Sequence, residues 1–144
     1  MTGRALILLV GAIVSLSGGL ATGMSEARAA EPKPDCNNAR NTYEMNYCSD
    51  LEFKSADREL NRVYRAAIAK RKQDGDAGPY TFKAWHNALK TSQRAWIKFR
   101  DADCEGVVVQ DWGGGSGTSA AVNGCRIELT RHRTASLKER YGIK

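Results

Sequence analysis

Features that mark several protein classes are scarce in this sequence of 144 residues. Only 3 residues are proline and only 8% are aromatic, which excludes collagen-like and proline-rich chains. Hydrophobic residues make up 42% and charged residues 26%, the balance of a folded globular protein rather than a disordered chain. The length predicts a single domain.

A hydrophobic run long enough for a membrane helix is also missing. The apolar stretch from Ala5 to Val14 follows Arg4 and then gives way to serine and glycine, whereas a spanning helix needs about 20 apolar residues. Residues 27–29 read Ala-Arg-Ala, the small-x-small pattern of a signal-peptidase site. We therefore predict a cleavable signal peptide over residues 1–29 and one domain over residues 30–144. No cysteine precedes Cys36, so we expect an exported protein, periplasmic or secreted, without a lipid or membrane anchor.

All four cysteines lie in the predicted exported domain, where an even number indicates two disulfides. No Cys-x-x-Cys occurs, and His86 and His132 have no zinc-ligand spacing, so we expect no metal site. Four cysteines allow three pairings. We favour the one in which each bond brackets a local segment. That pairing is Cys36–Cys48 with Cys104–Cys125.

Apolar residues recur at helical spacing, and no segment alternates with the period of a strand. We expect a short helix over about residues 38–48, and a longer one to about residue 72 that is capped by Ser49 and Asp50. Two more follow, over about residues 80–104 and from about residue 118. The sequence thus predicts an all-α fold, a small bundle of three main helices plus a short N-terminal helix, held by two disulfides. The third helix has the clearest apolar stripe: Phe82, Trp85, Leu89, Trp96 and Phe99, with Gln93, Arg100 and Asp103 near its borders.

Residues 105–117 are predicted to form a flexible loop, because they end in the glycine-rich run Gly113–Gly117. The run lacks the preceding strand and the Lys-Ser/Thr of a phosphate-binding loop, so we expect no cofactor. The favoured disulfide would close the loop at its base.

Catalytic and nucleic-acid-binding functions have little support. The carboxylates near the end of the third helix are spaced as in a solvated, arginine-paired face, and neither histidine has an evident serine partner. The formal charge of +6 suits acidic partners. Export and the lack of a known module nevertheless oppose nucleic-acid binding. We therefore predict a non-enzymatic binding protein.

The order of several motifs resembles a known family. The most specific motif is the run Gln93-Arg-Ala-Trp-Ile-Lys-Phe-Arg-Asp101, followed by Cys104. Before it stands Asp57-x-x-Leu-Asn-x-x-Tyr64, and after it Cys125-x-x-x-Leu-Thr-x-x-Arg133. From Cys36 to Leu137 the chain resembles the lysozyme-inhibitor LprI-like N-terminal domain family. The resemblance implies an exported, helical, disulfide-bonded domain, with lysozyme inhibition as its candidate activity.

We expect most residues of the family motif to stabilise the fold rather than to form a binding surface. Apolar members are expected in the core, amides between helices, and arginines beside carboxylates. These are Leu60, Tyr64, Trp96 and Phe99 for the core, Asn61 and Gln93 for hydrogen bonds, and Arg100 and Arg133 for carboxylate pairing.

Two binding functions follow as expectations. The first is a protein partner, in particular a lysozyme-type muramidase; the alternative is a basic periplasmic cell-envelope factor that binds anionic wall polymers, with a cell-wall hydrolase less favoured. Because animal-type lysozymes are basic, an acidic patch is needed for the first. The residues predicted to bind the partner are Asp103, Glu105, Asp111 and Trp112, at and beside the loop.

Overall fold

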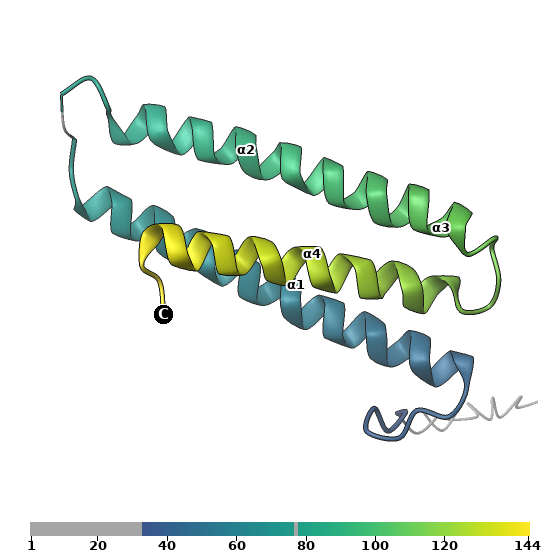
Figure 1. Cartoon of the computed structure of the whole chain (residues 1–144). Coiled ribbons are helices and arrows are strands. Elements are labelled where there is room, and N and C mark those ends of the chain that lie inside the picture. The colour runs from purple at the N-terminus through teal and green to yellow at the C-terminus, as the bar shows by residue number, and fades with distance from the viewer. Residues whose placement is uncertain (1–32, 77) are drawn as a thin grey trace, which may run out of the picture. The chain divides into compact units, whose positions relative to one another are not determined.

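The computed structural model describes residues 33–76 and 78–144, in which every regular element is a helix. Three helices are long: α1 (Thr42–Gln73), α2 (Phe82–Ala102) and α4 (Thr118–Tyr141). A π-helical turn, η1 (Asp103–Val107), and one further turn, α3 (Val108–Asp111), prolong α2. Figure 1 shows the three long helices side by side, with α2 antiparallel to both α1 and α4. The predicted all-α bundle of three main helices is confirmed.

The short N-terminal helix is not a separate element, and this part of the prediction is wrong. Residues 38–48 and the helix after them belong mostly to α1, which is continuous from Thr42. Ser49 does not cap a new helix, because its hydroxyl donates to the carbonyl of Asn46 inside α1, at 3.0 Å. No glycine or proline interrupts the segment, so nothing forces a break.

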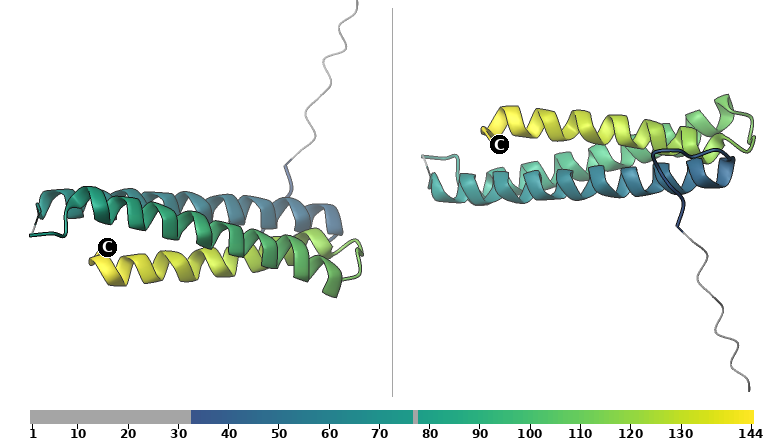
Figure 2. Two further views of the ribbon diagram at one scale, coloured as in Figure 1. Left: turned by 90° about the horizontal axis from the view of Figure 1, so that it is seen from above. Right: turned by 90° about the horizontal axis from the view of Figure 1, so that it is seen from below.

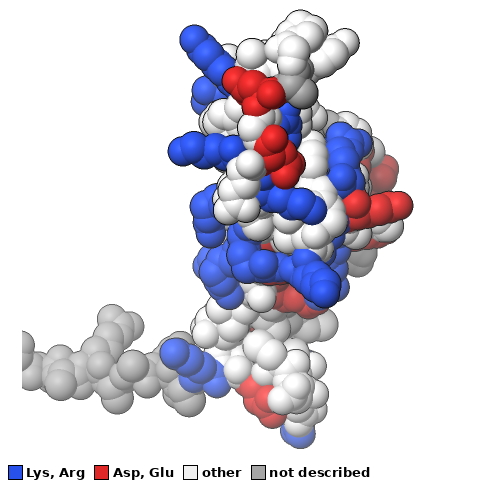
Figure 3. All heavy atoms as spheres, turned by 90° about the vertical axis from the view of Figure 1, so that its left-hand side faces the viewer, with Lys and Arg blue, Asp and Glu red and all other residues white. Residues whose placement is uncertain are grey.

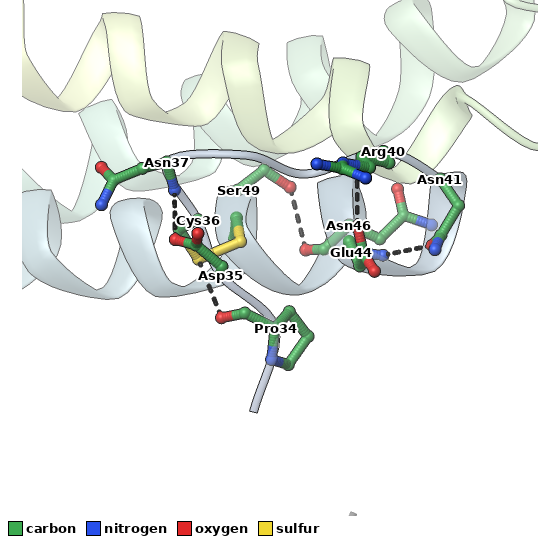
Figure 4. Close-up of a disulfide and its surroundings, with 10 residues drawn as sticks. Pro34, Asp35, Cys36, Asn37, Arg40, Asn41, Glu44, Asn46 and Ser49 are labelled. Atoms are coloured by element: carbon green, nitrogen blue, oxygen red, sulfur yellow. Dashed lines mark hydrogen bonds between the residues drawn. A yellow bond between two sulfur atoms is a disulfide. The ribbon is translucent and has the colours of Figure 1, made fainter. Parts of the chain in front are cut away.

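A capping arrangement sets the first residue of α1. The Asn41 side chain accepts a hydrogen bond from the Glu44 backbone N–H at 2.9 Å, and the Glu44 carboxylate accepts one from the Arg40 N–H at 2.6 Å. Figure 4 shows these contacts beside the first disulfide. Together they satisfy backbone donors that the first turn of a helix leaves free.

Both disulfides pair as predicted. Cys36–Cys48 joins Cα atoms 5.4 Å apart, and Cys104–Cys125 joins Cα atoms 5.6 Å apart. The first holds the segment before α1 against its second turn. The second ties η1 to α4, and Cys104 is fully buried. Each bond closes a local loop, which stabilises the fold by about 3 kcal/mol on the chain-entropy estimate.

α1 and α4 form the most extensive helix–helix interface, with α2 packed alongside through longer side chains. Figure 2 shows the three helices from above and below. The apolar core consists of Leu60, Val63, Leu89 and Leu137. Small buried residues, including Ala67 and Thr134, let α1 and α4 approach closely. The Thr134 hydroxyl is satisfied, since it donates to the Thr130 carbonyl at 2.8 Å.

The buried stripe of α2 differs from the predicted one. It passes through Gln93 and Arg100, which are 9% and 6% exposed, whereas Phe99 is 56% exposed. Trp85 and Trp96 pack against the core but are only partly buried. The prediction that Phe99 is a core residue is wrong, because the neighbouring Arg100 occupies the inward position.

Arg100 can be buried because its guanidinium is fully engaged. It lies over the rings of Phe53 and Trp96, at 5.3 and 5.2 Å from their centroids. It also pairs with Asp101 at 2.8 Å and with Asp57 at 3.6 Å. One further hydrogen bond, at 3.3 Å, goes to the hydroxyl of Thr130 on α4. The predicted carboxylate pairing of Arg100 is confirmed.

Of the other polar motif residues, one has its predicted partner and two do not. Gln93 accepts a hydrogen bond from Arg133 at 3.0 Å, so its predicted role between helices is confirmed. Arg133 pairs with Gln93 and with the Ser92 hydroxyl rather than with a carboxylate. Among the residues that the structure describes, Asn61 bonds only to Asp57, which lies on its own helix. The predictions for Arg133 and Asn61 are therefore wrong.

An ion-pair cluster also joins α1 to α4. Glu59 accepts hydrogen bonds from Arg62 at 2.7 and 2.8 Å, and pairs with Lys138 at 2.8 Å. The bonds from Arg62, followed by those from Lys138, lower the pKa of Glu59 from 4.5 to about 2. Because the folded state holds this carboxylate ionised, protonation at low pH opposes folding.

No helix in the described part of the chain is long and apolar enough to cross a membrane. The predicted signal peptide, residues 1–29, lies outside the described residues.

Because Arg100 is stacked on two aromatic rings and bonded to two helices, its replacement should strongly reduce the stability of the fold. Arg100→Ala should lower the free energy of unfolding by about 2–3 kcal/mol, because stacking, packing and charge-assisted hydrogen bonds are lost together. Arg94→Ala, an exposed position on the same helix, serves as the matched control and should change it by less than about 0.5 kcal/mol. Urea unfolding measures both, and equal losses would contradict this account of Arg100.

The Glu59 cluster predicts a pH dependence of stability. Its contribution is present above pH 4.5 and is lost as the pH falls toward about 2, the folded-state pKa. Glu59→Gln should therefore be less stable than the wild type at pH 6, and the gap should narrow by pH 2. Urea midpoints at the two pH values test this. A gap that stays constant would show that Glu59 titrates alike in both states.

Candidate partner-binding surface

The chain remains helical well beyond the predicted end of its third helix. η1 and α3 carry it to Asp111, so the expected loop over 105–117 is reduced to residues 112–117. Gly106 lies inside the π-helical turn without breaking it. The break comes at Gly113 and Gly114, whose φ angles of 59° and 72° are in the left-handed region that favours glycine.

The short loop is closed at its base, as predicted. Cys104 in η1 is bonded to Cys125 in the second turn of α4, on the far side of the loop. This bond restricts how far the two helix ends can separate. The loop therefore presents its side chains from a constrained framework, which reduces the entropy lost when a partner binds.

Trp112 lies at the start of this loop and is 55% exposed. Its backbone N–H donates to the Val108 carbonyl at 3.1 Å and ends α3. Its indole lies directly against Gly117, where an added Cβ would come within 2.8 Å of the ring carbon Cζ3. Gly117 therefore supports the indole and leaves much of its surface open to solvent.

The three predicted acidic residues are in different environments. Asp111 is exposed and makes no ion pair with any described residue. Glu105 is paired with Arg126 at 3.1 Å. Asp103 is half-buried, with its carboxylate beside the sulfurs of Cys104 and Cys125, which are bonded to each other. The structure thus brings all of them to one end of the bundle but leaves Asp111 as the most available.

Exposed apolar side chains at the same end were not predicted. Val107 is 55% exposed and Phe99 56%. Tyr43 and Met45, in the first turn of α1, are 63% and 46% exposed, and Figure 1 places that turn at the same end as α3. The π-helical turn alters the helical register after Ala102, a change that apolar spacing alone does not reveal.

Charge is divided unequally along the bundle. Residues 33–57 and 96–131, here called the disulfide end, hold 10 Asp and Glu against 7 Lys and Arg. Residues 58–95 and 132–144, here called the basic end, hold 4 Asp and Glu against 13 Lys and Arg. The predicted acidic patch therefore lies on the less positive half of a molecule whose overall charge is positive.

Residues 35–137 match the family described as lysozyme inhibitor LprI, from just before the first disulfide to Leu137 in α4. The chain belongs to the LprI family. Both disulfides, η1 and the Trp112 loop lie within the range that matches the LprI family.

Two relatives of this LprI family member are similar along much of their length. An uncharacterized protein of Rhizobium meliloti is 42% identical over 117 residues, covering 78% of this chain and 83% of the relative. The uncharacterized protein YecT of Escherichia coli is 35% identical over 98 residues, covering 63% of this chain and 59% of the relative. No solved structure matches.

Close contact between Trp112 and Gly117 predicts that the glycine positions the indole. Gly117→Ala should push the ring away, because the added Cβ would overlap it. The near-ultraviolet circular dichroism of tryptophan should change while the helical far-ultraviolet signal stays the same. Gly124→Ala, where a Cβ meets nothing within 4 Å, is the matched control. Identical near-ultraviolet spectra for both variants would contradict the contact.

Proposed function

We propose that this protein is an exported, non-enzymatic inhibitor that binds lysozyme-type muramidases through its disulfide end. The observation that carries the proposal is the LprI family match over residues 35–137, a family described by lysozyme inhibition. The match supports a protein partner. The position of the binding surface and the identity of the muramidase are our own inferences.

The geometry of the Trp112 loop supports recognition at this end. A half-exposed tryptophan is a common energetic anchor at protein interfaces, because it buries a large area at little cost in side-chain entropy. Gly117 orients the indole, and the Cys104–Cys125 bond restrains the helices on either side. Exposed Val107 provides apolar surface in the turn just before α3.

Electrostatics supports the same end. A basic muramidase is repelled by a positive surface and attracted by a less positive or acidic one. Asp111 is free to meet such a partner, whereas Glu105 is already neutralised in part by Arg126. We therefore assign the largest electrostatic contribution to Asp111.

The two disulfides support export. Such bonds form and persist in oxidising compartments outside the cytoplasm. The predicted signal peptide over residues 1–29 gives the same expectation, and the family resemblance agrees with it.

Inhibition is tested by the lysis of a muramidase-sensitive cell suspension with and without the purified, disulfide-bonded protein. We expect lysis to slow as the protein approaches stoichiometry with an animal-type muramidase. No inhibition at micromolar excess, against animal-type and bacterial muramidases alike, would refute the proposal. Clearing of a cell-wall zymogram by the protein alone would indicate a hydrolase instead.

Variants locate the surface. Trp112→Ala should weaken binding about 30-fold, or about 2 kcal/mol, with little change in melting temperature. Tyr80→Ala, an aromatic residue 77% exposed at the basic end, is the matched control and should leave binding unchanged.

The charge variant addresses the rate of association. Asp111→Lys should mainly slow association and flatten its salt dependence, whereas the same change at exposed Glu139 should have a smaller effect. Surface plasmon resonance measures both rates. Equal effects of the two lysine variants would place the binding surface elsewhere.

A further inference from the structure

The basic end of the bundle carries the strongest charge in the molecule. Its 13 Lys and Arg residues face only 4 Asp and Glu, a net charge of +9. Figure 3 views this end directly and shows Lys and Arg side chains gathered over the middle of the visible face, where they outnumber the acidic groups. The muramidase-binding surface proposed above makes no use of this end.

Two adjoining hollows lie within this charged end, and both are lined by Arg140 and Tyr141. One has a volume of about 280 Å³, between α4 and the Trp85–Ser92 part of α2. The other has a volume of about 270 Å³ and continues toward α1 at Lys70 and Arg71. Arg140 therefore stands where the two hollows meet.

The guanidinium of Arg140 has no hydrogen bond or ion pair within residues 33–76 and 78–144. Its neighbours are engaged: Lys70 donates to the Tyr141 carbonyl at 2.8 Å, and Arg71 donates to the Tyr80 carbonyl at 3.1 Å. Neither side chain is ion-paired within the described residues, and Asp74 is the single acidic residue in the lining of the two hollows. An anion in the hollows would be the missing counter-charge.

Arg133 adds a second uncompensated guanidinium two turns earlier on α4. Its partners, the Gln93 amide and the Ser92 hydroxyl, are neutral. Burial, and then the like charge of Arg140, lowers the pKa of Arg133 from its ordinary value. Two positive groups are therefore held near each other with no carboxylate bonded to either.

Aromatic rings border the same hollow. Trp85 and Tyr141 meet edge to face with centroids 5.6 Å apart, and both line the space beside Arg140. An aromatic face suits the C–H surface of a sugar ring, and a guanidinium binds a carboxylate in a bidentate manner. The Ser92 hydroxyl is a further polar group in the lining. Open, linked hollows within dispersed positive charge fit a chain of repeating acidic units.

We propose that the basic end is a second binding site, which takes a carboxylate-bearing polysaccharide with Arg140 at its centre. The site is separate from the muramidase surface and does not depend on it. A molecule with both sites could remain on an acidic polysaccharide layer while its disulfide end binds a muramidase.

The test uses the purified, disulfide-bonded protein and polygalacturonate, a polysaccharide with one carboxylate on each sugar. We expect binding by isothermal titration calorimetry at low salt, weakened as salt is raised, and no binding to uncharged dextran of similar length. Arg140→Gln should weaken binding about tenfold, as expected for the loss of one charge-assisted pair.

Matched controls separate this site from net charge alone. Lys98→Gln removes one exposed positive charge from the disulfide end and should change polygalacturonate affinity less than twofold. Trp112→Ala should leave it unchanged, so failure of one proposal is distinguishable from failure of the other. Equal losses in Arg140→Gln and Lys98→Gln would overturn the site. So would absence of polygalacturonate binding, or binding only to anionic phosphatidylglycerol vesicles.

Discussion

The guanidinium of Arg100 joins the three long helices through contacts that the helix backbones do not make. α2 approaches α1 and α4 less closely than those two approach each other, so side chains must bridge the space. Arg100 bridges it by stacking on Phe53 of α1 and donating to Thr130 of α4. Arg126 lies 4.1 Å from the centroid of the same Phe53 ring and pairs with Glu105 of η1. The cation–aromatic stack therefore also helps to fix the disulfide end, one turn beyond Arg100.

The two ends of the bundle differ in the chemistry they offer. The disulfide end has a supported tryptophan, a closed loop and nearly balanced charge, which suit a folded protein partner. The basic end has an arginine with no ion pair among the described residues and two adjoining hollows, which suit an extended acidic ligand. The formal net charge of the chain, +6, does not reveal this difference, because it is the sum of a slightly acidic end and a strongly basic one. A basic protein can in this way have a surface to which a basic enzyme binds.

Local features of the fold were predictable from the sequence, and features that depend on contacts between helices were less so. The disulfide pairing follows from segments of 12 and 21 residues that each bond brackets. The burial of Arg100 in place of Phe99 could not be read from hydrophobicity, because Phe53, Asp57 and Thr130, which accommodate it, come from other helices. No break occurs at Ser49, because an N-cap residue has an extended backbone and its side chain accepts from an N–H ahead of it, whereas Ser49 is helical and its hydroxyl donates back to the Asn46 carbonyl. At the candidate site, the exposure of Trp112 was predictable from its small neighbours, but its contact with Gly117 required the structure.

Central to this account is the claim that the disulfide end is the surface that binds a muramidase. Titration of isotopically labelled protein with an animal-type lysozyme, followed by amide chemical-shift mapping, tests that claim directly. The account predicts shifts confined to η1, α3, the loop over 112–117 and the first turns of α1 and α4. Shifts centred on Lys70, Arg140 and Tyr141 at the basic end, or no shifts at all, would contradict it.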